Sequence, residues 1–501
     1  MKCVPKTISS LELTLHQRLP HQTLANWLYG ELRLAIVEGR LKPGARLPAS
    51  RDFAKQYGLS RGTVVSVLER LQADGYVSCR VGSGTWVNRV QTADLVCKPN
   101  CAPPVYIRQV ISGYIRPKPL AGLVTRSGIH PFSMRDPDIS QFPAELWGRV
   151  AARRARTVRS WLRTEDDGRG YLPLRDAIAG YLAASRGVRC HPDQIIVVSG
   201  VQLALDLLSR LLLKPGDPVW MEDPGYFGAM IAFGNVGARI IPVPVDEQGL
   251  SVSAGLEVCP HAKGAYVTPA HQFPIGMTMS LERRMALLTW ASRAGAFVIE
   301  DDYDSEYRFE GQPVPALQSL DRHSNVILIG SFSKLLFPSL RIGYVVLPSS
   351  LVDYFLAFRC RIDFRNLNLD QAVLCDFIND GHLGRHLRRM RELYAGRLAA
   401  LIDGAKQYLK GLLEVSDVRA GLYTAGFLKN GTASKKAEQA AATRDVEVLA
   451  LDRFTLQCPD PKGVLLGFAA FDEAAIRAGL TNLAAALGQR MPRNKGSGIY
   501  H

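Results

Sequence analysis

The sequence predicts an α/β fold in two parts, a small helical N-terminal domain and a larger domain with a mainly parallel sheet wrapped by helices. The chain has 501 residues, enough for about two to four domains, and 47% of them are hydrophobic. Short apolar runs alternate with helical stretches through the larger part, as they do when crossover helices join parallel strands. The first part instead shows helical periodicity, and residues 1–126 together carry +11 of the net charge of +15.

The formal net charge of +15 is concentrated near the N-terminus. Residues 1–88 contain 12 Lys and Arg against 6 Asp and Glu, and residues 89–126 contain 6 against 1. A solvated surface would spread this charge over the whole chain. Its concentration favours a polyanion partner such as nucleic acid, because neutralising phosphates releases counterions.

Several classes of protein are disfavoured by composition. The sequence has no apolar run long enough to cross a membrane, and residues 1–10 lack the hydrophobic core of a signal peptide. Nine cysteines are scattered without regular spacing, as expected of reduced thiols. The closest pair, Cys97 and Cys101, has no second Cys/His pair to complete a metal site. We therefore expect a cytoplasmic protein with no membrane segment and no metal.

Residues 1–88 are expected to form three helices followed by a β-hairpin. Apolar residues recur at helical spacing in three segments. They are Leu24, Leu28, Leu32 and Ile36 in the first, Phe53, Ala54 and Tyr57 in the second, and Val64, Val67, Leu68 and Leu71 in the third. Ser60 can cap the third helix. Alternating residues on either side of Gly82-Ser-Gly84 predict the hairpin.

This arrangement predicts a winged helix-turn-helix, whose second helix enters the major groove of DNA. The residues expected to contact phosphates, base edges or the minor groove are Arg51, Ser60, Arg61, Thr63 and, at the hairpin tip, Ser83. A small helical interaction domain would also show three helices. The hairpin, the capped third helix and the charge asymmetry together favour a double-stranded DNA operator as partner.

Residues 89–126 are basic and contain several prolines without a sustained period. They are expected to form a linker with a root-mean-square span of roughly 35 Å, long enough to separate the two domains. Residues 127–501 then contain apolar runs that predict strands. These runs are 195–198, 218–220, 297–299, 326–329 and 344–347. Ligands of such sheets bind beyond the carboxyl ends of the strands, where the chemical candidates of this chain lie.

Two of these strand ends carry the parts of a pyridoxal phosphate (PLP) pocket. Lys334 supplies an amine that can form a Schiff base, and partial burial beside cations would favour its uncharged form. Asp301 can hold a pyridine nitrogen protonated, and Tyr303 can bind the ring hydroxyl. An isolated lysine would be read as solvated surface, and an acidic strand end as a helix cap. Their combination predicts the cofactor.

The cofactor phosphate and ring also have candidate partners. Gly200, Val201 and Gln202 begin a helix directly after a strand, where backbone amides and the helix dipole favour an anion. The side chains that can complete the phosphate site are Ser331, Ser333 and Arg341. Tyr226, after the turn Asp223-Pro-Gly, can stack on the aromatic ring.

Three segments of the first domain resemble the winged-helix domain of GntR-family regulators. They are Leu47-Pro-Ala-Ser-Arg51, Leu59-Ser-Arg-Gly-Thr-Val64 and Gly82-Ser-Gly-Thr85. Most of residues 130–490 resembles fold-type I aminotransferases, a fold with a smaller α+β C-terminal subdomain. Gly170-Tyr-Leu-Pro-Leu-Arg-Asp176, Thr268-Pro-Ala-His-Gln-Phe-Pro-Ile-Gly276, Glu300-Asp-Asp-Tyr-Asp-Ser-Glu306 and the Lys334 segment resemble the MocR subfamily, which joins these two domains in transcriptional regulators.

The resemblance implies roles for single residues, and the sequence departs from some of them. Subfamily members that respond to amino acids are expected to hold the ligand carboxylate with arginines. Here Gly228 follows the stacking tyrosine, residues 463–468 contain no arginine, and Tyr423 replaces a usual histidine. Either another basic group serves, with Arg453 a weak candidate, or the ligand is not a simple carboxylate.

We therefore expect a homodimeric, PLP-dependent transcriptional regulator that senses an amine, an amino acid or PLP itself. Two alternatives remain open at this point. The chain could be an aminotransferase that turns over substrate, with an autoregulatory DNA-binding domain, or a dimerisation scaffold that has lost its cofactor. Catalytic residues on a fold do not by themselves establish turnover, so transamination is expected to be at most partial.

Overall fold

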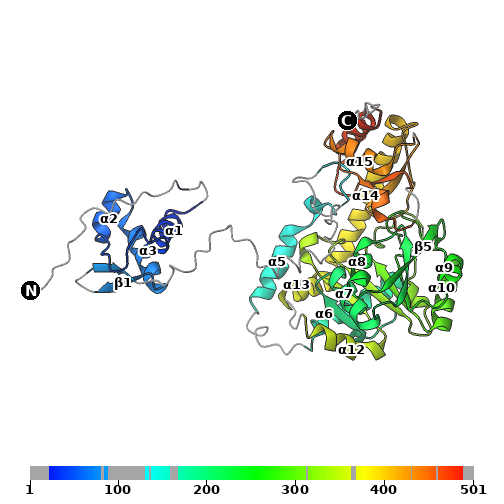
Figure 1. Cartoon of the computed structure of the whole chain (residues 1–501), viewed down its shortest axis with the longest axis horizontal. Helices are drawn as coiled ribbons and strands as arrows, with labels where there is room; N and C mark the ends of the chain where they lie inside the picture. Colours follow the sequence, from blue (N-terminus) through cyan, green and yellow to red (C-terminus); the bar gives the residue numbers. More distant parts are fainter. Residues whose placement is uncertain are drawn as a thin grey trace, which may run out of the picture. The chain divides into compact units, whose positions relative to one another are not determined.

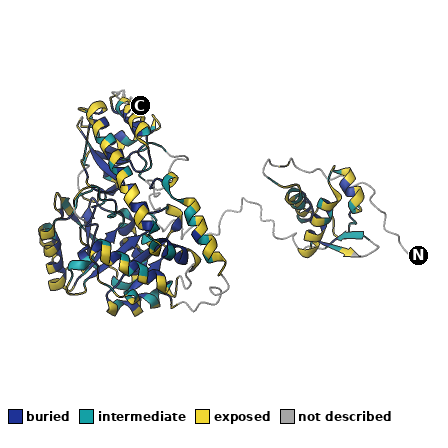
Figure 2. Ribbon diagram, turned by 180° about the vertical axis from the view of Figure 1, so that it is seen from behind, coloured by how far each residue is buried: buried dark blue, intermediate teal, exposed yellow. Residues whose placement is uncertain are grey.

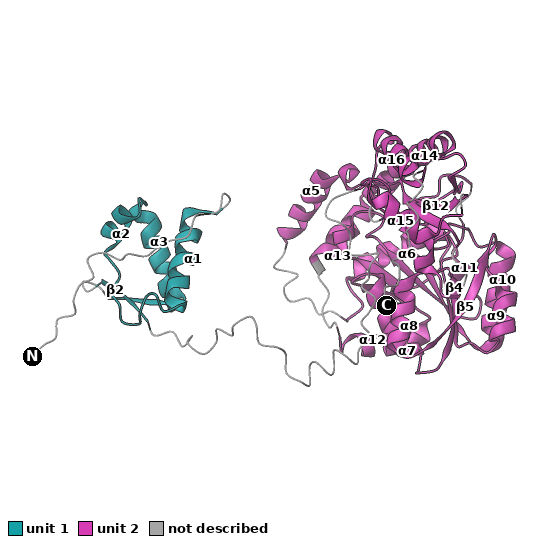
Figure 3. Ribbon diagram, turned by 45° about the horizontal axis from the view of Figure 1, so that its top comes forward, with its two compact units in different colours: residues 1–119 teal, residues 120–501 magenta. Residues whose placement is uncertain are grey.

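The computed structural model divides the chain into two compact units, residues 1–119 and 120–501 (Figure 3). The residues that it describes are 18, 22–80, 84–88, 130–134, 137–157, 167–311, 314–362, 368–429, 431–457 and 461–488. The expected linker, residues 89–126, and Ser83 at the expected hairpin tip lie outside this described part.

The described part of unit 1 has the three helices and the hairpin expected from the sequence (Figure 1). The elements are α1 (Leu24–Val37), α2 (Ser50–Gln56), α3 (Arg61–Ala73), β1 (Val77–Arg80) and β2 (Gly84–Val87). The two strands pair antiparallel. The Ser60 hydroxyl oxygen caps α3 by accepting a hydrogen bond from the Thr63 amide at 3.0 Å, which confirms its predicted role.

The core of unit 1 follows the predicted apolar spacing with one exception. Leu28, Leu32, Phe53 and Val64 are fully buried. The expectation that Leu24 also faces inward is wrong, since its side chain is 45% exposed. Leu24 is the first residue of α1, one turn before the part of the helix that packs, and the buried face of α1 is instead completed by Ala35.

Unit 2 is built on an eight-stranded sheet of described strands in the order β3-β10-β9-β8-β7-β4-β5-β6. Their bounds are β3 (Ile195–Val198), β4 (Pro218–Asp223), β5 (Arg239–Asp246), β6 (Gly249–Leu250), β7 (Gly264–Val267), β8 (Phe297–Asp302), β9 (Val326–Ser331) and β10 (Gly343–Val346). Strands β4, β5, β7, β8 and β9 run parallel to one another. Strand β10 runs antiparallel to its neighbours β3 and β9, and β6 runs antiparallel to β5. The carboxyl ends of β3, β4, β7, β8 and β9 therefore share one edge.

Helices cover both faces of this sheet. They are α6 (Leu172–Arg186), α7 (Val201–Leu212), α8 (Phe227–Asn235), α9 (Val252–Val258), α10 (Leu281–Ala294), α12 (Ser349–Arg359) and α13 (Asn368–Asn379), with α5 (Ala144–Ala155) against α13. Alternate residues of β3 belong to different cores, because Val197 packs with α6 and Ile196 with α7. Figure 2 shows the sheet buried and the outer faces of the helices exposed. Burial on both faces explains why these strands are continuous apolar runs.

The C-terminal part of unit 2 is the smaller α+β subdomain that the resemblance implied. It contains the long helix α14 (His382–Tyr408), α15 (Ser434–Ala442), α16 (Glu473–Gly488) and the short helix η5 (Leu451–Phe454). Its antiparallel sheet has the order β11-β12-β14-β13, with β11 (Leu413–Val415), β12 (Tyr423–Leu428), β13 (Leu449–Ala450) and β14 (Gly463–Gly467). None of the described helices combines the length and apolarity needed to cross a membrane.

A buried ion pair joins the start of the described part of unit 2 to α14. The Arg397 Nη2 donates to Asp138 Oδ2 at 2.7 Å, and both side chains are buried. The Asp138 amide also donates to the Tyr394 hydroxyl at 2.9 Å. Burial by itself would raise the pKa of Asp138, but hydrogen bonds from Ser140 and Arg397 hold it below its ordinary value.

We predict that Arg397→Met destabilises unit 2 by about 3–5 kcal/mol, because Asp138 would remain as a buried charge without its partner. The folded-state pKa of Asp138 lies below its unfolded value, so the loss should be complete at neutral pH and shrink as pH falls through the folded pKa. Urea denaturation followed by circular dichroism measures both effects. The double variant Asp138→Asn with Arg397→Met is the control and should recover part of the loss. A single variant as stable as the parent protein would contradict the prediction.

Candidate functional site

The shared strand edge of unit 2 collects the residues predicted for the cofactor. Asp301 lies at the end of β8, Lys334 in the turn after β9, Tyr226 after β4 and Gly200 after β3. Arg341 lies two residues before β10, whose opposite direction brings its start to the same edge. Segments separated by more than a hundred residues in the sequence thus meet because their strands are neighbours in the sheet.

Asp301 has the environment that a ring-nitrogen partner requires. Its side chain is only 4% exposed, and the Tyr266 hydroxyl donates to its Oδ2 at 2.6 Å. Its Oδ1 is buried and has no hydrogen-bond partner among the described residues. Burial raises the pKa of Asp301 to about 7, with the Tyr266 hydrogen bond opposing the shift. An unsatisfied buried carboxylate oxygen fits a ligand that presents a protonated nitrogen.

Gly200 and Arg341 lie together at the start of α7. The Arg341 Nη2 donates to the Ser199 carbonyl at 3.1 Å, and a Cβ added to Gly200 would lie 3.6 Å from the same nitrogen. Gly200 has φ +97°, which favours glycine, and no side chain caps the helix that begins at Val201. An uncapped helix start beside a guanidinium is a suitable phosphate site.

The two serines predicted for the phosphate lie at the end of β9 and in the turn that follows. Ser331 is buried, Ser333 is half-buried, and the Ser333 amide donates to Ser331 Oγ at 3.2 Å. This contact orders the turn that carries Lys334, which is itself half-buried. The structure therefore gives the serines a local role in shaping the turn, and their contact with a phosphate stays a prediction.

Tyr226, Gln202 and Gly228 form a tight cluster at the start of α8. The Gln202 Nε2 donates to the Gly228 carbonyl at 2.9 Å. A Cβ added to Gly228 would lie 2.5 Å from the ring of Tyr226 and 2.6 Å from Gln202 Oε1. The ring of Tyr226 is parallel-displaced from that of Tyr266, with centroids 6.4 Å apart. Gln202 thus holds α8 through its side chain, and glycine at position 228 leaves room for the tyrosine ring.

Tyr303 belongs to a buried polar cluster that sequence reasoning missed. Its hydroxyl donates to the His271 carbonyl at 2.9 Å and lies 2.6 Å from the Tyr423 hydroxyl. The His271 Nδ1 lies 2.9 Å from Asp304 Oδ2, and both side chains are 1% exposed. Burial raises the pKa of Tyr303 well above its ordinary value. The residue types at 271 and 423 were visible in the sequence, but nothing local indicated that they meet.

Glu222 is a second residue that the sequence did not single out. It is fully buried at the end of β4 and accepts hydrogen bonds from Thr268 Oγ1 at 2.7 Å and Gln272 Nε2 at 3.3 Å. Burial raises its pKa to about 7, against these hydrogen bonds. Both donors belong to the 268–276 motif. The 268–276 motif was the signal in the sequence that could have pointed to Glu222. The side chain of Glu222 fixes the loop that this motif forms.

The C-terminal subdomain reaches the same edge through the segment after η5. The Asp223 carboxylate accepts hydrogen bonds from the amides of Leu456 at 2.8 Å and Gln457 at 2.9 Å. The Gly225 amide donates to the Phe454 carbonyl at 2.9 Å. The turn that positions Tyr226 is therefore bound directly to the smaller subdomain.

Arg453, the weak candidate for a ligand carboxylate, already has a carboxylate partner. Its Nε and Nη2 donate to the two oxygens of Glu438 at 2.8 and 2.6 Å. The bidentate pair satisfies the planar donor fork of the guanidinium. The structure therefore does not support a ligand-binding role for Arg453.

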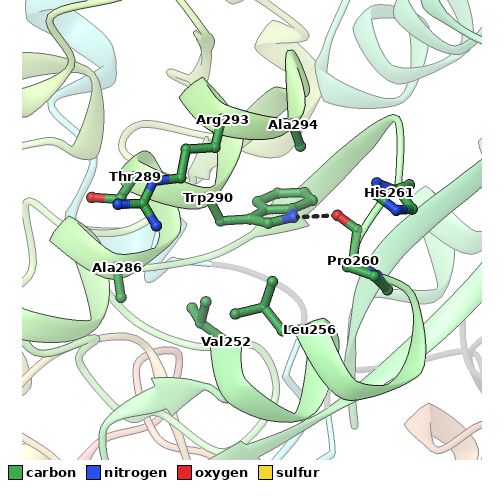
Figure 4. A pocket seen from close by; sticks show the side chains of 9 residues that line it. All are labelled: Val252, Leu256, Pro260, His261, Ala286, Thr289, Trp290, Arg293 and Ala294. Carbon is green, nitrogen blue, oxygen red and sulfur yellow. Dashed lines mark hydrogen bonds between the residues drawn. The ribbon is translucent and has the colours of Figure 1, made fainter.

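A separate pocket lies between α9 and α10 (Figure 4). Its lining includes Val252, Leu256 and Trp290, whose indole nitrogen donates to the Pro260 carbonyl at 3.0 Å. None of the residues predicted for the cofactor lines it. The pocket is mostly apolar and is not part of the site at the strand edge.

In unit 1 the residues that were predicted to contact DNA differ in how exposed they are. Arg51 and Arg61 are exposed at the starts of α2 and α3. Thr63 is half-buried, and its hydroxyl lies 2.8 Å from that of Ser60. The two hydroxyls therefore contribute first to the helix cap. Sequence reasoning missed Arg46, which lies over the ring of Trp86 and supports the described part of the hairpin.

Two family models match this chain. The aminotransferase class I and II family matches residues 151–483, and the GntR family of bacterial regulatory proteins matches residues 24–87. Among solved structures, the alpha-aminoadipate aminotransferase LysN of Thermus thermophilus, complexed with N-(5'-phosphopyridoxyl)-L-leucine, is 27% identical with a TM-score of 0.69. The likeness covers 75% of this chain and 96% of that one.

Relatives also share both domains. The probable rhizopine catabolism regulatory protein MocR of Rhizobium meliloti is 38% identical over 92% of this chain and 92% of its own length. The pyridoxine biosynthesis transcriptional regulator PdxR of Corynebacterium glutamicum is 31% identical over 91% of this chain and 95% of its own. With a GntR-type winged helix ahead of an aminotransferase fold, and with likeness to regulators along nearly its whole length, this chain belongs to the MocR subfamily of GntR-family transcriptional regulators.

Proposed function

We propose that this regulator binds PLP covalently through Lys334 and changes its action on a double-stranded DNA operator when an amine, an amino acid or PLP itself binds. The observation that carries the proposal is the buried carboxylate of Asp301, which keeps one oxygen without a partner among the described residues. The LysN neighbour was solved with a phosphopyridoxyl adduct, which supports the same class of cofactor.

Each residue of the site has a separate task in this proposal. Lys334 provides the attaching amine, and Asp301 keeps the pyridine nitrogen protonated. Arg341 and the start of α7 at Gly200 hold the phosphate, with Ser331 and Ser333 in the adjoining turn, while Tyr226 stacks on the ring. When bound, PLP supplies an aldehyde that reacts reversibly with primary amines and a ring that withdraws electrons from them.

The effect of the ligand on DNA binding is proposed to pass through the smaller subdomain and to involve a homodimer. The hydrogen bonds of Asp223 and Gly225 bind the Tyr226 turn to the segment after η5, so a ligand at the ring edge can bias the position of that subdomain. Two winged helices in a dimer suit paired half-sites. A ligand shifts the equilibrium between two arrangements of the winged helices only as far as it binds one arrangement better than the other.

An aminotransferase that turns over substrate is the second candidate. The aminotransferase fold and its solved relatives favour it. Position 228 weighs against it, because the glycine there supplies no side chain that could hold a substrate carboxylate. Sustained production of a keto acid from an amino acid would establish turnover, whereas a single half-reaction would fit a sensor.

We predict that Lys334→Ala abolishes covalent cofactor attachment. The parent protein, purified from cells supplied with vitamin B6, should show a visible absorbance band and a PLP adduct on the peptide containing Lys334 after borohydride reduction. The variant should show neither. Lys214→Ala, at an exposed lysine after α7, is the matched control and should behave as the parent does. A parent protein without an adduct would overturn the proposed function.

We predict that PLP rebinding to the apoprotein weakens as pH falls below about 7, because Asp301 then becomes protonated and can no longer hold the pyridinium proton. Asp301→Asn should bind PLP more weakly at pH 8 and lose this component of the pH dependence. Fluorescence titration with PLP between pH 6 and 8 measures both. Parallel pH profiles for the two proteins would remove Asp301 from its assigned role.

We predict that Arg61→Ala weakens operator binding by about 1–3 kcal/mol if the side chain contacts a base edge. Arg40→Ala is the control, since Arg40 is already paired with Glu38 in the turn after α1. Fluorescence anisotropy on the operator at fixed salt gives the two affinities. Equal losses in both variants would indicate only a general electrostatic contribution from Arg61.

A further inference from the structure

A wall of aromatic rings lies beside the residues assigned to the cofactor. Phe273 is at its centre, with ring centroids 5.6 Å from Tyr226, 6.3 Å from Tyr303, 5.9 Å from Tyr423 and 5.1 Å from Phe454. These rings come from both the large sheet and the smaller subdomain. The polar groups of these rings are the hydroxyls of Tyr226, Tyr303 and Tyr423. Burial raises the pKa of all three, to about 12 for Tyr226 and well above the ordinary value for the other two.

Among the described residues, the groups around this wall that could pair with a ligand carboxylate are absent or engaged elsewhere, as His271 is with Asp304 at 2.9 Å. Gly228 supplies no side chain, and a Cβ there would lie 2.5 Å from the Tyr226 ring and 2.6 Å from Gln202 Oε1, so both would have to shift to admit one. Arg453, next to Phe454, is held in a bidentate pair by Glu438. Arg341 lies against Gly200 at the proposed phosphate site.

Arg308 is a third arginine, after Arg453 and Arg341, that could face a ligand. It is half-buried, and the described residues give it no carboxylate partner. Its guanidinium, however, neighbours Thr278, at 3.5 Å, and the position of Gly311. None of its described contacts is with the aromatic wall, so its location does not match a ligand bound over the Tyr226 ring.

From this wall we infer that the effector is a primary amine with an apolar or aromatic body and no carboxylate beside the amine. The inference rests on the proposed function, because the amine is recognised through the PLP held by Lys334. Apolar groups gain from contact with the half-buried ring of Phe273, which packs against the buried ring of Phe454. A carboxylate placed against the same rings would lose its water without gaining a cation, which is unfavourable.

Matched pairs of probes test this on the full-length holoprotein. 2-Phenylethylamine is compared with phenylalanine, and 3-methylbutylamine with leucine, since each pair differs only by the carboxylate. The concentration that half-saturates the change in the cofactor band is measured for each probe. The same titrations of free PLP give the ratio of the two half-saturating concentrations in the absence of protein. The ratio measured with the protein is then divided by this intrinsic ratio. After this correction each amine should act at a concentration lower by about tenfold or more.

Two results would overturn the inference in distinguishable ways. A protein that lacks the cofactor band before titration would refute the proposed function and this inference with it. A holoprotein that responds to the amino acids as well as to the amines would refute the inference alone. In that case Arg308→Gln and Arg453→Gln identify the carboxylate partner, since the responsible variant should lose the response to amino acids and keep the response to amines.

The aromatic part of the inference has its own variant. Phe454→Leu removes a ring and keeps an apolar side chain, so folding is least disturbed. It should raise the half-saturating concentration of 2-phenylethylamine several-fold while leaving that of methylamine unchanged. Equal changes for the two amines would show that the ring at position 454, which supports Phe273, does not shape the surface that receives the body of the effector.

Discussion

The parallel alignment of β4, β7, β8 and β9 is the constraint on which the rest of the second unit depends. Because these strands run in one direction, their carboxyl ends deliver side chains from distant parts of the chain to a single edge. The same burial that stabilises the sheet removes water from the edge. A carboxylate there, such as Asp301, is tolerated only with hydrogen-bond partners, and Tyr266 supplies one of them.

Burial at this edge also explains why polar residues occur in linked groups. Glu222 is satisfied by Thr268 and Gln272, and Tyr303 by His271 and Tyr423. Each group joins the end of one strand to a loop or to the smaller subdomain. The site is therefore rigid on the sheet side, while its connection to the segment after η5 depends on a few hydrogen bonds between two parts of the fold.

The winged helix depends mainly on contacts between residues that are close in the sequence. Ser60 accepts a hydrogen bond from the Thr63 amide in the first turn of α3, and a small apolar core joins the three helices. Arg51 and Arg61 remain exposed at helix starts, where guanidinium groups can reach phosphates or bases. Recognition of DNA and recognition of a small molecule are thus built on separate cores within one regulator.

The sequence by itself determined what local patterns encode. Apolar runs located β3, β4, β8, β9 and β10 but not β5, β6 and β7, and Ser60 stood where a helix cap was needed. Lys334 and Asp301 stood where an amine and a carboxylate are predicted to hold the cofactor. Only the tertiary structure decided the partners. Tyr266 and Asp301 are 35 residues apart, Tyr303 and Tyr423 are 120 apart, and Arg453 is committed to Glu438. Such pairs form when the sheet and the subdomain assemble, and no local spacing encodes them.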